Sequence, residues 1–207
     1  MMKRLTIIDF VEKYTREYNE LTFLREKVDG KWTETSFRQT REEAYRIGAG
    51  LIQLGLKKGD KTALLSQGRN LWITSELGIL YAGGVNVPLS IKLTETTDLL
   101  FRIQHSDSRF VIVSEQQLPK IRSIIDQCPK VEKVIVLDPI SEYHKNEMSI
   151  NDVIALGEAY LKEQMACAGK YFVNKEDSGI ELIRVENSYQ LCFGLVMVAK
   201  YSIIQEI

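Results

Sequence analysis

The central part of the chain alternates short apolar runs with longer amphipathic segments, and this alternation constrains the fold more than any other feature. The apolar runs have four or five residues each, as expected for buried strands, and lie at 62–66, 85–89, 110–114 and 134–137. Strands that alternate with helices form right-handed βαβ units. We therefore predict an α/β domain built on a mostly parallel sheet with helices on both faces.

Five amphipathic segments are predicted to be the helices of this domain. They lie at 37–54, 70–82, 94–105, 118–127 and 149–168. Gly55 suits the left-handed C-terminus of the first helix, and Gly83-Gly84 breaks the second. Gly48 and Gly50 inside the first helix each cost about 1 kcal/mol relative to alanine. We therefore expect a close backbone contact at those two positions.

A helix and a hairpin are predicted ahead of the sheet. Thr6 and Asp9 have the spacing of a helix start. The helix after them should present one face made by Ile7, Val11, Tyr14, Thr15 and Tyr18. Segments 21–27 and 31–36 are strand-like, and Asp29-Gly30 between them supplies the positive φ angles of a tight turn. We expect this hairpin to lie beside the main body.

Charge and cysteine usage restrict the partners and the compartment. The 27 Lys and Arg residues balance 28 acidic residues, without blocks, so we expect no nucleic-acid partner. Small molecules or proteins are the expected partners. Cys128, Cys167 and Cys192 are far apart and odd in number, which favours reduced thiols in a cytoplasm.

No targeting or membrane-spanning segment is predicted. Asp9 follows the basic start too soon for the apolar core of a signal peptide. The late apolar stretch 191–204 is interrupted by Lys200 and is shorter than the roughly 20 residues that span a bilayer. We expect a soluble, cytoplasmic protein without a transmembrane segment.

Several short pieces occur in the order and spacing of a known family. They are Trp32-Thr-Glu-Thr-Ser36, Gly48-Ala-Gly-Leu51, Leu54-Gly-Leu-Lys-Lys-Gly-Asp60, Asn70-Leu-Trp72 and Ala82-Gly-Gly-Val-Asn-Val-Pro-Leu89. Over about 21–162 the chain thus resembles the start of the long-chain fatty-acyl-CoA synthetases, which belong to the adenylate-forming superfamily. The resemblance implies a ligase that joins a fatty carboxylate to ATP, releases pyrophosphate and passes the acyl group to coenzyme A, with Mg²⁺ assisting.

The phosphate loop of those enzymes has no counterpart in this sequence. In the family it is rich in Ser, Thr and Gly, ends in Pro-Lys-Gly, and would follow Gly169. The chain instead continues Tyr171-Phe-Val-Asn-Lys-Glu-Asp-Ser-Gly179. We therefore expect two regions: a partial AMP-binding domain over 1–168 and a divergent tail over 169–207.

Candidate anion-binding groups are few outside such a loop. Phosphate is normally held by N–H groups of a Gly-rich turn with a nearby Lys. The Gln67-Gly-Arg-Asn70 turn lies between a strand and a helix, and we favour Asn70 as the helix cap there. The pairs Pro119-Lys120 and Pro129-Lys130 lack flanking glycines, so we expect ordinary helix-start or loop roles for them.

The remaining candidate residues favour structural roles. His105 should close a helix as a C-terminal cation, and neither it nor His144 has metal-ligand neighbours. Trp32 and Trp72 could line an acyl pocket, but packing is the favoured role of both rings.

Two serines end predicted strands. Ser66 and Ser90 therefore lie at the edge where open α/β sheets bind ligands, but neither has the flanking glycines of a hydrolase elbow.

Three hypotheses follow. The favoured one is a fragment of a long-chain acyl-CoA ligase, inactive as this chain alone, for which we assign no catalytic, cofactor-binding or metal-binding residue. In the full-length family ATP, Mg²⁺ and CoA would bind. The second is a non-catalytic interaction module with the same fold, and the third is a small nucleotide-binding domain that uses the 67–70 turn. An incomplete sheet should expose apolar surface, so homo-oligomers are also expected.

Overall fold

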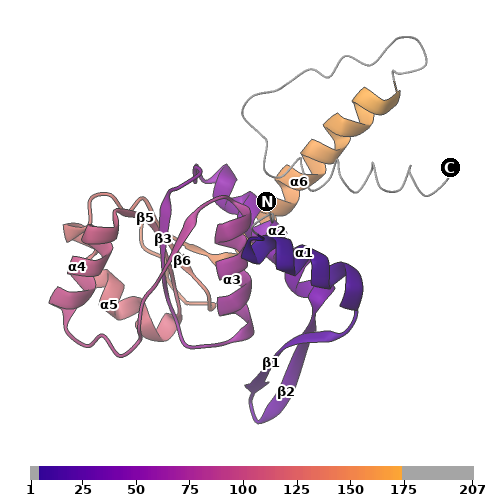
Figure 1. The fold of residues 1–207 in the computed structure, drawn as a ribbon. Coiled ribbons are helices and arrows are strands. Elements are labelled where there is room, and N and C mark those ends of the chain that lie inside the picture. The colour runs from indigo at the N-terminus through magenta and orange to yellow at the C-terminus, as the bar shows by residue number, and fades with distance from the viewer. Residues whose placement is uncertain (1–4, 174–207) are drawn as a thin grey trace.

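A parallel five-stranded sheet forms the centre of the computed structural model, which describes residues 5–173, with side chains through Gln164. The strand order is β4-β3-β5-β6-β7, and all neighbouring pairs are parallel. The strands are β3 (Lys61–Leu65), β4 (Val85–Pro88), β5 (Ser108–Val113), β6 (Lys133–Val136) and β7 (Glu147–Ser149). The predicted α/β class is therefore confirmed (Figure 1).

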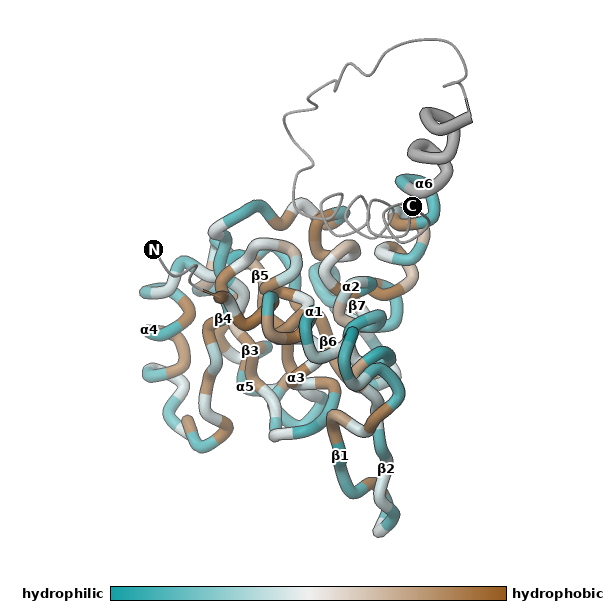
Figure 2. Tube along the Cα trace, turned by 45° about the vertical axis from the view of Figure 1, so that its right-hand side comes forward, coloured by the Kyte–Doolittle hydropathy of each residue, from teal (hydrophilic) through white to brown (hydrophobic). Residues whose placement is uncertain are grey.

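Helices cover both faces of this sheet. One face packs against α2 (Phe37–Gln53), α3 (Asn70–Tyr81) and α6 (Ile150–Val173), and the other against α4 (Thr96–Ser106) and α5 (Leu118–Arg122). Alternate residues of each strand enter the two cores, as the pleat requires: Val111 and Val113 of β5 belong to one, Phe110 and Ile112 to the other. Figure 2 shows the central strands as the most hydrophobic part of the trace.

Glycines set the distances between α2 and its neighbouring helices. A Cβ atom on Gly48 would lie 2.8 Å from the carbonyl oxygen of Gly78 in α3. A Cβ on Gly50 would lie 2.0 Å from the carbonyl oxygen of Val153 in α6. The predicted close backbone contact is confirmed, and it explains why two poor helix formers occur inside α2.

The N-terminal helix α1 (Ile7–Tyr18) begins with the predicted capping box. Thr6 and Asp9 exchange side-chain and backbone hydrogen bonds. The predicted face is partly wrong, because Ile7 is 60% exposed while Ile8 and Val11 pack against the α2–α3 core. Adjacent helical residues differ by 100° around the axis, and the packing partner decides which of them turns inward.

The hairpin is a separate two-stranded sheet of β1 (Thr22–Val28) and β2 (Lys31–Ser36). Asp29 and Gly30 have φ angles of 49° and 80°, which confirms the predicted turn. The hairpin tip extends away from the central sheet in Figure 1, while the hairpin base lies against α2 and α3.

Three elements differ from the predictions. Strand β7 has only three residues, too few to show an apolar pattern. The helix expected at 118–127 is instead α5 followed by a 3₁₀ turn at Ile125–Gln127. The Ser123 hydroxyl donates to the Lys120 carbonyl, which supplies a local alternative to helix continuation. Helix α6 also continues beyond the predicted end at 168; most of the expected tail lies outside the described residues.

Candidate functional site

A row of polar residues follows the carboxyl ends of the central strands. Ser90 comes after β4, Ser66 after β3, Ser114 after β5, and Asp138 after β6. Backbone hydrogen bonds between neighbouring strands continue as far as this edge. The Ser114 amide donates to the Leu65 carbonyl at 3.1 Å, and the Leu137 amide donates to the Val113 carbonyl at 2.9 Å.

This edge contains the topological switch point of the sheet. The chain leaves β3 for α3 on one face and leaves β5 for α5 on the other, so the crevice between their ends is where open α/β sheets bind ligands. Sequence reasoning identified Ser66 and Ser90 and missed Ser114 and Asp138. The same signal, a polar residue directly after an apolar strand, could have found all four.

Two polar side chains at this edge are buried without a protein partner among the described residues. The Ser114 hydroxyl and the side-chain oxygen of Gln117 (Oε1) have no hydrogen bond. The Ser66 hydroxyl, in contrast, donates to the backbone carbonyl of Gln67 at 3.1 Å. The side-chain amide of Gln67 (Nε2) also donates to Gln116 Oε1. The Gln67–Gln116 hydrogen bond thus spans the crevice between the ends of β3 and β5.

The N-terminus of α3 is occupied by a carboxylate from the hairpin. The Asn70 amide donates to Glu26 Oε2 at 2.6 Å, and Asn70 Nδ2 donates to Thr35 Oγ1 at 3.1 Å. Arg69, not Asn70, holds the N-cap position, and its side chain makes no cap hydrogen bond. The predicted Asn70 cap is wrong, because the folded-back hairpin brings an anion to the positive end of the helix.

Arg69 is held by a bidentate ion pair. Its Nη1 and Nη2 lie 2.6 and 3.0 Å from Asp138 Oδ1 and Oδ2. The Glu115 amide also donates to Asp138 Oδ2, at 2.8 Å. Burial alone would raise the pKa of Asp138, but the bonds from Arg69 and Glu115 hold it below its ordinary value.

The two Pro-Lys pairs have the structural roles expected of them. Lys120 Nζ donates to the carbonyls of Ile91 and Leu93, both at 2.9 Å, and so fastens the loop after β4. Lys130 Nζ lies 2.7 Å from the Asp107 carboxylate on the surface.

The histidines and Cys128 show no catalytic arrangement. His105 lies in the last turn of α4, as predicted, with its ring 5.2 Å from that of Phe101. His144 is exposed and donates its backbone amide to Glu147 at 2.9 Å. Burial raises the pKa of the Cys128 thiol, which disfavours the nucleophilic thiolate. Among the residues whose side chains the structure describes, no three His, Cys, Asp or Glu side chains gather as a metal site.

The tryptophans differ in environment. Trp72 is half-buried against the core, as predicted, but Trp32 is 61% exposed on β2, so its predicted packing role is wrong. The Arg25 guanidinium lies 4.9 Å from the Trp32 ring. Both indole rings border an open groove between β1 and α3 that also includes Arg69.

A second polar cluster joins α1 to the body. Glu12 Oε1 accepts hydrogen bonds from Arg41 Nε at 2.7 Å, Tyr45 Oη at 3.0 Å and Tyr81 Oη at 2.8 Å. Burial would raise the pKa of Glu12, but the bonds from Arg41, Tyr81 and Tyr45 together lower it. The sequence contained no signal for this cluster, since its members come from three helices.

Comparison with characterised proteins identifies the fold and the family. The chain resembles 4-hydroxybutyrate–CoA ligase 2 of Metallosphaera sedula, with 30% identity over 135 residues, 65% of this chain and 24% of the relative. It also resembles the mouse long-chain-fatty-acid–CoA ligase ACSBG2, with 29% identity over 157 residues, 74% of this chain and 23% of the relative. The chain thus spans about a quarter of the length of these relatives.

Solved structures of adenylate-forming ligases superimpose on this chain. The anthranilate CoA ligase AuaEII, crystallised with anthranoyl-AMP, superimposes with a TM-score of 0.67 and 26% identity, over 75% of this chain and 29% of that one. Among the described residues, no helix has the length and apolar character needed to cross a membrane. A family model for AMP-binding enzymes matches residues 11–168, which is more than half of the sequence. The chain therefore belongs to the AMP-binding enzyme family, and its relatives are adenylate-forming acyl-CoA ligases.

Proposed function

We propose that this chain forms the first α/β unit of an AMP-forming long-chain fatty acid–CoA ligase and does not catalyse adenylation by itself. The whole reaction converts a fatty carboxylate, ATP and CoA into acyl-CoA, AMP and pyrophosphate. One observation carries the proposal: the Asn70 amide, the two Arg69 amino groups and the lysines of the two Pro-Lys pairs, which were the candidate phosphate ligands, already bind other parts of the protein. In this proposal residues 1–168 are the partial AMP-binding domain, and 169–207 are a divergent tail.

Adenylation requires cations and N–H donors arranged around the phosphate oxygens before the carboxylate attacks. The Asn70 amide at the start of α3 already donates to Glu26, and both amino groups of Arg69 donate to Asp138. Lys120 donates to two carbonyls. We therefore assign no catalytic, cofactor-binding or metal-binding residue to this chain. ATP, Mg²⁺ and CoA would bind to the full-length ligase.

Long-chain fatty acids are the proposed acyl substrates. The alignment to the mouse long-chain ligase covers 74% of this chain, against 65% for the 4-hydroxybutyrate ligase. It includes parts of the chain that the shorter alignment omits.

A cytoplasmic location is also proposed. It is supported by the unpaired, buried Cys128.

Exchange of labelled pyrophosphate into ATP tests the proposed inactivity. We expect the purified chain to give no exchange that depends on added hexadecanoate. Carboxylate-dependent exchange would refute the proposal.

A chimera tests the acyl preference. In it, residues 11–168 replace the matched segment of the mouse long-chain ligase, and thioester formation is compared for hexadecanoate and 4-hydroxybutyrate. Preference for 4-hydroxybutyrate would contradict the proposed chain length.

A small nucleotide-binding domain is the less favoured alternative, because Glu26 occupies the helix N-terminus that it would use. Equilibrium dialysis with ATP distinguishes the ligase fragment from the nucleotide-binding domain. ATP binding without pyrophosphate exchange would support the nucleotide-binding domain. Glu26→Ala provides the sharper version of the test, since it removes the competing carboxylate. If the Glu26→Ala variant also fails to bind ATP, the 67–70 turn is not a phosphate site.

A further inference from the structure

The hairpin has an unpaired backbone edge along β1. A two-residue turn follows Val28, so Val28 and Lys31 form a hydrogen-bonded residue pair. Hydrogen-bonded and non-hydrogen-bonded pairs alternate along an antiparallel ladder, and Arg25 and Lys27 therefore belong to non-hydrogen-bonded pairs. Their N–H and C=O groups point away from β2. Among the described residues, no backbone group of another element binds them.

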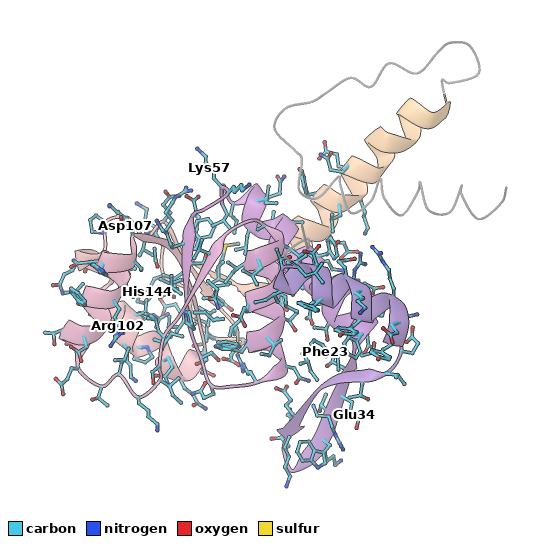
Figure 3. The ribbon with its side chains drawn as sticks, in the orientation of Figure 1. Phe23, Glu34, Lys57, Arg102, Asp107 and His144 are labelled. Atoms are coloured by element: carbon cyan, nitrogen blue, oxygen red, sulfur yellow. The ribbon has the colours of Figure 1, made fainter. Side chains whose placement is uncertain are left out.

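A groove of about 830 Å³ runs along this edge. Its lining includes every residue of β1 from Phe23 to Val28. Successive residues of a strand point to opposite faces, so a lining that includes both faces indicates a groove that follows the strand edge. The start of α3 forms the other wall, with Trp72 and Ile73. Figure 3 labels Phe23 at the base of the hairpin, where the groove begins.

An exposed strand edge beside a groove is the geometry that accepts an added strand. The backbone of such a strand would pair with the N–H and C=O groups of Arg25 and Lys27. Its side chains would alternate between the two faces of the hairpin. The two faces of β1 therefore determine which side chains the added strand can have.

The face of β1 that bears Arg25 and Lys27 favours acidic side chains in an added strand. Trp32 and Glu34 lie opposite these residues on β2 and share their face. Arg25 Nε lies 3.0 Å from Glu34 Oε1, and the guanidinium also lies 4.9 Å from the Trp32 ring. Lys27 is exposed and has no ion pair among the described residues. A carboxylate directly opposite Lys27 would supply that missing charge partner.

The other face of β1 favours apolar side chains. Leu24 and Val28 flank Glu26 there, beside the apolar wall formed by α3. The Glu26 carboxylate already accepts a hydrogen bond from the Asn70 amide, so it would repel a second carboxylate placed beside it. Val28 is 45% exposed and would lose apolar surface to water-free contact with an added strand.

The charges of β1 argue against a second copy of this strand as the occupant. In an antiparallel pair of two β1 strands, a two-fold axis at or between Arg25 and Lys27 places basic side chains opposite each other. Like charges directly opposite destabilise a strand pair. The nearby acidic Asp29 lies in the turn, beyond the paired residues, and does not compensate.

We propose that the outer edge of β1 binds an extended segment of another polypeptide, which adds antiparallel as a third strand of the hairpin sheet. The residues of this segment alternate in character. Carboxylates lie on the face of Arg25 and Lys27, and apolar side chains point toward α3. This interaction goes beyond the proposed ligase function, and it uses no residue at the carboxyl edge of the central sheet.

Blocked synthetic peptides test the charge preference and the backbone pairing on the full chain. The probe alternates Val and Glu and has the seven-residue length of β1. Isothermal titration calorimetry should show that it binds at least about tenfold more tightly than the same peptide with Lys in place of Glu. In antiparallel register the Glu residues direct their N–H groups toward β1. N-methylation at Glu should therefore abolish binding, whereas N-methylation at Val should be tolerated.

Substitutions at Lys27 separate the charge from the backbone donor. Lys27→Glu should weaken binding of the Val/Glu peptide about tenfold and strengthen binding of the Val/Lys peptide. Lys27→Gln removes only the charge, whereas Lys27→Pro also removes the outward N–H and should weaken binding further. The matched control is Lys31→Glu, the same charge change on β2 outside the groove lining, which should alter the affinity less than about twofold.

Three results would overturn the proposal. The first is no binding of the Val/Glu peptide at concentrations up to about 1 mM. The second is binding that persists when the Glu nitrogens are methylated, or that is equal for the Glu and Lys peptides. The third is an equal loss of affinity in Lys27→Glu and Lys31→Glu. Far-ultraviolet circular dichroism of each variant confirms that the fold is retained.

Discussion

The central sheet and the N-terminal helix–hairpin region are stabilised in different ways. Every apolar side chain of β5 is fully buried between two helical layers. In α1 only Thr15 is buried, and the helix is fastened mainly through Glu12 and its three partners on α2 and α3. The hairpin is fastened through Glu26 and Thr35 to Asn70. Burial is spread over the whole central sheet, whereas a few polar bonds position the N-terminal region.

This difference implies that the two regions can be weakened separately. Loss of apolar contacts in the sheet should reduce the global free energy of unfolding. Loss of a polar anchor should open α1 or the hairpin locally and leave the sheet protected. The substitutions below test that distinction.

Phe110→Ala should have the largest effect. Phe110 is fully buried in β5, and its removal leaves a cavity between the sheet and the helices α2 and α6. We expect a loss of about 3–5 kcal/mol in the free energy of unfolding, measured by urea denaturation. Phe101→Ala, at an exposed position, should change that value by less than about 0.5 kcal/mol. Equal losses at the two positions would contradict the proposed role of burial.

Gly50→Ala should come next. Its Cβ would lie 2.0 Å from the Val153 carbonyl oxygen, so α2 and α6 must separate. We expect a loss of about 2–3 kcal/mol, as for overpacking in a core. The control is Gly68→Ala, where nothing lies within 4 Å of the added atom, and the same urea titration should detect little change.

Glu12→Gln should weaken α1 alone. Replacing the carboxylate weakens charge-assisted bonds to Arg41 and the two tyrosines, at a cost of about 2 kcal/mol near neutral pH. Hydrogen exchange should show faster exchange in α1 and unchanged protection in β5. The control is Glu17→Gln on the exposed face. Loss of protection in β5 would show that the two regions unfold together.

The same variant predicts a pH dependence. The folded pKa of Glu12 is lowered, whereas its unfolded value is about 4.3. Ionised Glu12 therefore stabilises the fold above that unfolded value, and the contribution is lost as pH falls through the folded pKa. The stability difference between the unmodified protein and Glu12→Gln should shrink on acidification below about pH 5. A difference that grew on acidification would contradict this sign.

Glu26→Ala should have the smallest effect. It removes the acceptor at the start of α3, and we expect a loss of about 1 kcal/mol, as for a helix cap. The fluorescence of Trp32 and Trp72, which border the groove beside the hairpin, should report its displacement. Glu26→Gln retains an acceptor oxygen and should change the fluorescence less. Identical spectra for Glu26→Ala and the unmodified protein would show that Glu26 does not position the hairpin.

Local sequence signals predicted much of the fold. The Asp29-Gly30 turn, the capping box at Thr6 and the glycine contacts of α2 depend on near neighbours or on the absence of a side chain. The three-residue strand β7 was missed because it is too short to show a period. The cap at Asn70 was mispredicted because its replacement, Glu26, comes from 44 residues away.

The sequence alone determined the order along the chain of the helices and of the longer strands, as well as the family resemblance, because apolar periodicity and short motifs are local properties. Only the tertiary structure decided which charged groups are engaged: Glu26 with Asn70, Arg69 with Asp138, and Glu12 with its three helical partners. Each of these contacts joins elements distant in the chain, and its geometry exists only once the sheet and its helices have assembled.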